Sequence, residues 1–73
     1  MEKKVKSILL KLLEIEEKNF SQDISIQNCV TWDSVTQLNI ILALEKEFKV
    51  TFNDVEMLEL TSFANIINAL KKK

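Results

Sequence analysis

The sequence has neither glycine nor proline among its 73 residues. Its turns therefore cannot use the residues that most readily supply a positive φ or a fixed φ. This disfavours a β-protein with many tight hairpins and favours helices joined by loops of Asn, Asp, Ser and Thr. Histidine is also absent, so the commonest general base and metal ligand is missing. Without paired carboxylates in a cleft or a glycine-rich phosphate loop, we expect no catalytic centre and no metal site.

Cysteine is nearly absent and long apolar runs are missing. The single Cys29 cannot form an internal disulfide, whereas a small secreted domain usually carries several cysteines. Lysines at positions 3, 4, 6 and 11 interrupt the first apolar residues, so we expect no signal peptide. The longest apolar run, residues 38–44, is too short to span a bilayer. We therefore expect a cytoplasmic protein without membrane insertion.

The charges are almost balanced. Ten lysines stand against eleven acidic residues, which gives a formal net charge of −1. Nucleic-acid binding requires a basic face, so this balance argues against it. A small helix-turn-helix DNA-binding protein would need a basic recognition helix, and neither the second nor the fourth expected helix provides one. The lysines at 71–73 are best explained as a helix end, where the helix dipole favours cations.

Apolar spacing predicts one helix followed by a long loop in the first half. Residues 2–17 form an amphipathic helix with an apolar face of Val5, Ile8, Leu9, Leu12 and Ile15. Residues 18–32 lose this period and predict a long loop. Four apolar side chains of the loop are expected to anchor it to the core: Phe20, Ile24, Ile26 and Val30. A loop of this length with its own anchors is often functional.

The second half predicts three more helices. One should begin at Asp33 or Ser34 and run to about residue 48. Asn53 and Glu56 have the spacing of a capping box that opens a short third helix. Thr61 or Ser62 caps a fourth helix, whose apolar face comprises Phe63, Ile66, Ile67 and Leu70. The predicted fold is an all-α bundle of four helices, formed by residues 1–73 as one domain and one monomer.

Ser34 lies where the long loop meets the second helix, and the local sequence suggests that it caps this helix. Residues 34–37 fit the capping-box pattern, in which the serine hydroxyl accepts a backbone N–H bond. Asp33 could serve equally well as the cap. We expect Trp32 to be a hydrophobic plug that closes the loop over the bundle, and Cys29 to be a small buried apolar residue.

The whole chain also resembles the acyl carrier protein family. Asp33, Ser34 and Val35 match the Asp-Ser-Leu that opens the family's second helix, with a conservative last change. Residues 38–48 match the apolar helix that ends in Leu-Glu-x-x-Phe. Residues 50–52 match the extended step before the third helix, and residues 60–63 with 66–67 match the join into the fourth.

This resemblance implies a covalent cofactor, a 4′-phosphopantetheine arm, which a phosphopantetheinyl transferase moves from coenzyme A to the Ser34 hydroxyl. It also implies that Asp33 helps to present the serine to that transferase. The carrier catalyses nothing itself and exchanges thioester cargo with an acyl- or aminoacyl-loading ligase and with acyltransferase or synthase enzymes. An anionic phosphodiester suits a helix N-terminus, where backbone N–H groups and the dipole favour negative charge.

Residues after the serine have two readings. Helical spacing indicates that Leu38, Ile41, Leu42 and Leu44 belong to the core. The resemblance implies instead that apolar residues beside the serine contact partner enzymes. The positions that we expect to form this partner-binding face are Val35, Thr36, Leu38, Asn39, Leu42 and Glu45.

This stretch departs from carriers of general fatty-acid biosynthesis, which place acidic residues after the serine. Here the polar residues are Thr36, Gln37 and Asn39. Because charge complementarity sets on-rate and partner choice, we expect a carrier for a dedicated pathway. Residues 32–34, Trp-Asp-Ser, also resemble small carriers of specialised pathways such as surface-polysaccharide modification. The dedicated pathways that we expect are those of lipid, polyketide-like or surface-polysaccharide metabolism. An aminoacyl carrier is one alternative, and an unmodified helical interaction or regulatory module is another.

Overall fold

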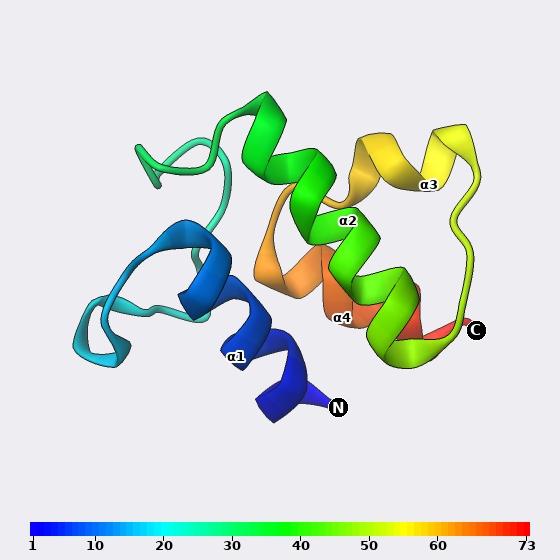
Figure 1. The fold of residues 1–73 in the computed structure, drawn as a ribbon, viewed down its shortest axis with the longest axis horizontal. Coiled ribbons are helices and arrows are strands. Elements are labelled where there is room, and N and C mark those ends of the chain that lie inside the picture. The colour runs from blue at the N-terminus through cyan, green and yellow to red at the C-terminus, as the bar shows by residue number, and fades with distance from the viewer.

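The computed structural model describes residues 1–73, and its regular elements are all helices. Its elements are α1 (Glu2–Leu13), a 3₁₀ turn η1 (Glu17–Asn19), α2 (Ser34–Phe48), α3 (Asp54–Glu59) and α4 (Phe63–Lys71). Figure 1 shows α1 beside α2, with α4 behind α2 and the short α3 at one side. The predicted all-α bundle with a long first loop and a short third helix is confirmed.

One hydrophobic cluster holds the elements together, and it contains no buried polar side chain. Helices α1, α2 and α4 each contribute one stripe at helical spacing. The buried residues of these stripes are Val5, Leu9 and Leu13 from α1, Ile40, Ile41 and Leu44 from α2, and Phe63, Ile66, Ile67 and Leu70 from α4. Trp32, Ile24, Phe52 and Leu60 complete the cluster from the connecting segments.

Helix α1 is shorter than predicted, because it ends at Leu13 rather than near residue 17. Glu14 adopts a left-handed conformation, with φ 56° and ψ 43°, and its N–H donates to the Leu10 carbonyl. The Ile15 N–H donates to the same carbonyl at 3.2 Å. Helices commonly end with such a left-handed residue, usually glycine. Since the chain has no glycine, a glutamate takes the position, and apolar spacing could not reveal this stop.

The long loop is tied to the junction between α3 and α4. The Ile26 N–H donates to the Thr61 carbonyl at 2.9 Å, and the Phe63 N–H donates to the Ile24 carbonyl at 3.1 Å. The predicted anchor Ile24 is buried, and Phe20 and Ile26 pack partly against the core. Val30 was expected to be an anchor, but this prediction is wrong, since its side chain is fully exposed. The loop turns before Trp32, which takes the buried place instead.

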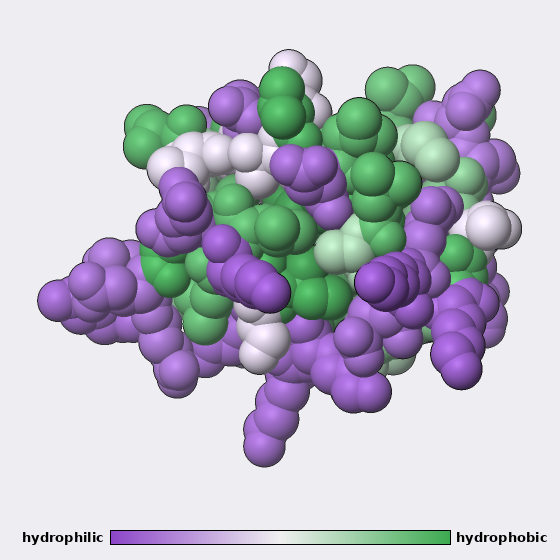
Figure 2. Space-filling model, in the orientation of Figure 1, coloured by the Kyte–Doolittle hydropathy of each residue, from purple (hydrophilic) through white to green (hydrophobic).

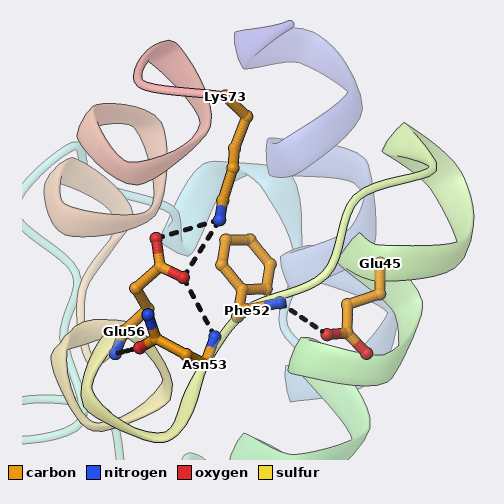
Figure 3. A network of polar contacts seen from close by, with 5 residues as sticks. All are labelled: Glu45, Phe52, Asn53, Glu56 and Lys73. Carbon is orange, nitrogen blue, oxygen red and sulfur yellow. Dashed lines mark hydrogen bonds and ion pairs between the residues drawn. The ribbon is translucent and has the colours of Figure 1, made fainter.

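Helix α3 is held at its ends (Figure 3). The Glu45 carboxylate on α2 accepts the Phe52 N–H at 2.9 Å. Asn53 and Glu56 form the predicted capping box, with both bonds between 2.8 and 2.9 Å. The Lys73 ammonium lies 3.0 Å from the Glu56 carboxylate and 5.2 Å from the Phe52 ring centroid. No residue of the helix is fully buried; the partly buried Met57 and the buried flanking residues Phe52 and Leu60 join it to the core.

No helix has both the length and the apolar character needed to cross a bilayer.

The buried face of helix α2 differs in part from the predicted one. Ile41 and Leu44 are buried as predicted, but Leu38 and Leu42 are more than half exposed. Ile40 is fully buried in their place. The helix is apolar on a wide arc, so spacing alone could not show which part of that arc faces the core.

Candidate functional site

The site begins with the segment that leads into α2. Trp32 is 2% exposed and closes the loop over the bundle, as predicted. Asp33 then adopts extended backbone, and its carboxylate accepts the Thr36 N–H at 2.8 Å. Of the two caps that the sequence left open, Ser34 and Asp33, the structure shows Asp33. Ser34 is the first residue of α2, and its side chain is exposed.

Asp33 sets the electrostatics at this helix start. The Thr36 backbone N–H, followed by the Thr36 hydroxyl, holds the pKa of the Asp33 carboxyl below its usual value of 3.8. Asp33 thus remains an anion at neutral pH. The first turn of α2 contains no acidic residue of its own, and helix N-termini favour bound anions. An exposed serine hydroxyl at this position fits esterification by an anionic phosphate.

A hydrogen-bonded bridge is centred on Gln37, about one helical turn after Ser34. The sequence analysis did not predict it. The Trp32 indole N–H donates to the Gln37 side-chain oxygen. The Gln37 amide nitrogen donates in turn to the Leu60 carbonyl at the end of α3. The sequence suggested Gln37 as the partner in a capping box with Ser34 and as an uncharged residue after the serine, but not as a bridge. No local pattern could have indicated Leu60, which lies 23 residues away in sequence.

The outer side of α2 and the adjoining α3 carry exposed apolar residues. We call this set the α2–α3 apolar surface; its exposed fractions are Val35 70%, Leu38 55%, Leu42 54%, Val55 67% and Leu58 80%. Figure 2 shows apolar side chains gathered along the upper part of α2 and over α3. Large exposed apolar patches commonly mark interaction sites.

The other partner-binding candidates lie around this surface in different settings. Asn39 is exposed, and Thr36 is half-buried under the Asp33 cap. Glu45 is half-buried, and its carboxylate is engaged by the Phe52 backbone. Val55 and Leu58 were not among the predicted residues. Their spacing of three residues is helical and would have suggested a core-facing pair, so spacing alone could not show that both are exposed.

Comparisons with known proteins agree with this geometry. Residues 3–70 match the family model described as "Phosphopantetheine attachment site". The acyl carrier protein of Petrotoga mobilis is 31% identical over 70 residues, covering 96% of this chain and 82% of the relative. That of Buchnera aphidicola subsp. Baizongia pistaciae is 31% identical, covering 99% and 92%. The acyl carrier protein homolog of Mycoplasma pneumoniae is 33% identical, covering 90% and 87%.

The matches span nearly the whole of this chain and most of each relative. The family's prosthetic group is 4′-phosphopantetheine, and its members are carriers rather than enzymes. The helical bundle and the exposed serine at the start of α2 are consistent with this assignment. The chain therefore belongs to the phosphopantetheine-binding acyl carrier protein family.

Proposed function

We propose that this chain carries acyl groups as thioesters on a 4′-phosphopantetheine arm attached to Ser34. The observation that carries the proposal is the exposed hydroxyl at the first residue of α2, released from capping because Asp33 caps the helix. In the transfer, the Ser34 oxygen forms a bond to the phosphorus that bears the pantetheine. The pyrophosphate bond of coenzyme A breaks, adenosine 3′,5′-bisphosphate leaves, and the transferase takes the hydroxyl proton.

Asp33 has two separable roles in this proposal. Its carboxylate caps α2 through Thr36, and its charge presents the serine to the transferase and the metal ion that the transferase holds. The Asp33→Asn variant separates these roles, because asparagine caps helices about as well as aspartate but carries no charge. We expect this variant to keep its helical content and to accept the arm more slowly.

The direct test is intact mass after incubation with coenzyme A and a phosphopantetheinyl transferase. We expect the wild-type chain to gain one phosphopantetheine unit and Ser34→Ala to gain none. Ser7→Ala removes another exposed serine hydroxyl, from α1, and should be modified like the wild type. An unmodified wild-type chain with several transferases would support the alternative of an unmodified interaction module.

The carrier's partners are, in our proposal, the transferase, a loading ligase and an acyltransferase or synthase of a dedicated pathway. The α2 part of the α2–α3 apolar surface supports this, because its neighbours after the serine are the uncharged Thr36 and Asn39. The exposed acidic residues Asp54 and Glu59 flank only the α3 part. A partner with an apolar docking face fits such a surface better than a partner with a basic face. Attachment of acyl or aminoacyl cargo is decided by the loading ligase.

A charge-addition experiment tests this choice of partner. We expect a general fatty-acid synthesis enzyme to turn over this carrier less well than its standard carrier. Thr36→Asp combined with Asn39→Glu should raise the turnover, mostly through association rate and in a salt-dependent manner. Asn68→Asp adds a charge on α4, away from the site, and should have no such effect. Wild-type turnover equal to that of the standard carrier would refute the dedicated pathway.

Two further proposals concern setting and organisation. We place the carrier in the cytoplasm, since its one thiol, Cys29, has no disulfide partner within the chain. We also propose that residues 1–73 act as a single carrier domain, because one hydrophobic cluster contains residues from α1 through α4.

A further inference from the structure

Gln37 occupies the point on α2 where the serine end of the helix meets the core. It follows Ser34 by three residues, which is close to one helical turn. It precedes Ile40, Ile41 and Leu44, the buried stripe of α2. A tethered chain that turned from Ser34 directly into the bundle along α2 would have to pass Gln37.

The Gln37 side chain closes this passage by joining three segments. It accepts the Trp32 indole N–H from the loop and donates to the Leu60 carbonyl at the end of α3. Both bonded neighbours are themselves buried, with Trp32 2% exposed and Leu60 0% exposed. The bridge therefore joins the loop, α2 and the end of α3 beside the core.

We propose that Gln37 is a latch that keeps the thioester-bound cargo outside the bundle, so that the carrier takes short or polar acyl groups. The proposal rests on attachment of the arm to Ser34. Entry of an alkyl chain along this route would break both bonds and leave the Trp32 N–H and the Leu60 carbonyl unpaired in a largely apolar setting. A buried polar group without a partner is strongly disfavoured.

Tight packing of the core also opposes the entry of an alkyl chain. Ile40, Leu44, Leu60 and Ile66 are fully buried. The larger surface depressions lie elsewhere, for example between α1 and α2 around Leu12 and Ala43. An alkyl chain longer than a few carbons would need to displace packed side chains as well as the latch. A short or polar group instead remains at the surface, where partner enzymes can reach it.

The experiment compares thioester exposure for two cargoes on the modified carrier. Acetyl and octanoyl arms are installed on the chain by the transferase from the corresponding coenzyme A thioesters, and hydroxylamine cleavage is followed by mass. Each rate is divided by that of the same thioester on free pantetheine. For the wild type, we expect the two normalised rates to agree, because neither chain enters the core.

Gln37→Leu removes both bonds at similar side-chain size. We expect its octanoyl thioester to be protected about tenfold relative to the wild type, as two hydrogen bonds of ordinary net strength would allow, with its acetyl thioester unchanged. Asn68→Leu makes the same kind of change at an exposed position of α4 and should behave like the wild type. Contacts from the octanoyl protons to the Ile40 and Leu44 methyl groups, observed by NMR only in Gln37→Leu, would confirm entry.

A wild-type octanoyl thioester that is already protected relative to acetyl would overturn the latch, whatever the variants do. Equal octanoyl rates in the wild type and in folded Gln37→Leu would overturn it too. If Gln37→Leu does not fold, Gln37→Glu replaces it, because glutamate keeps the acceptor for Trp32 but cannot donate to Leu60; unprotected octanoyl in that variant would also count against the latch. Absence of any mass gain at Ser34 would instead refute the attachment proposal, so the two failures are distinct.

Discussion

Replacing Trp32 by alanine should remove a large part of the stability of this carrier. Trp32 is the residue before the Asp33 cap, and only 2% of it is exposed. Its indole also donates to Gln37. The substitution therefore leaves a cavity beneath the loop and removes one partner of the latch at the same time.

The magnitude follows from burial and chain length. Truncation of a buried tryptophan to alanine costs about 3–5 kcal/mol of unfolding free energy. Native stability of roughly 0.05–0.15 kcal/mol per residue gives about 4–11 kcal/mol for 73 residues. We expect Trp32→Ala to lower the melting temperature by at least about 12 °C, at the low end of the usual conversion for a domain of this size.

Urea unfolding followed by far-UV circular dichroism measures this loss without relying on the tryptophan signal. Trp32→Phe keeps an aromatic plug but loses the indole donor, so its loss should be smaller than that of alanine. Val30→Ala is the matched control, because Val30 lies in the same loop and is fully exposed; it should stay within about 0.5 kcal/mol of the wild type. A loss below about 1 kcal/mol for folded Trp32→Ala would refute the assignment of Trp32 as the loop's main anchor.

Two further predictions concern the backbone and pH. Lys49 ends α2 in a left-handed conformation, with φ 55° and ψ 46°, so Lys49→Gly should raise unfolding free energy by about 0.5–1 kcal/mol, whereas Lys49→Val should lower it. The Asn53 N–H, followed by Lys73, lowers the pKa of Glu56 from 4.5; its contribution to stability is therefore complete above pH 4.5 and lost as the pH falls through the lowered pKa. In Glu56→Gln, the free energy of unfolding measured in urea should fall less steeply below pH 4.5 than in the wild type. Identical slopes for the variant and the wild type would contradict this role of Glu56.

Much of the fold could be predicted because its signals are local. The spacing of Ile66, Ile67 and Leu70 identified the buried face of α4, and the Asn53–Glu56 capping box identified the start of α3. The end of α1 could not be predicted, because the stop is a left-handed Glu14 rather than a glycine. Local pattern favours a helix wherever apolar residues keep their period, and it contains no information about such a backbone choice.

The candidate site, like the fold, could be predicted from the sequence only in part. The resemblance to the acyl carrier protein family singled out Ser34 and Asp33, whereas the local pattern indicated only a helix start. Which of the two would cap α2 could not be decided, because both side chains accept backbone N–H bonds well. The Gln37 bridge and the exposure of Leu38 depend on contacts with distant segments. Such contacts are set by tertiary packing and are invisible to short-range spacing.

Helix α3 has a consequence for how this carrier could diversify. None of its residues is fully buried, and it is held by the partly buried Met57 and by the anchors Phe52 and Leu60 that flank it. The outward positions Val55 and Leu58 are therefore nearly free of folding constraints. Substitutions at these two positions, whether natural or designed, can therefore change which partner the carrier binds while the fold stays the same.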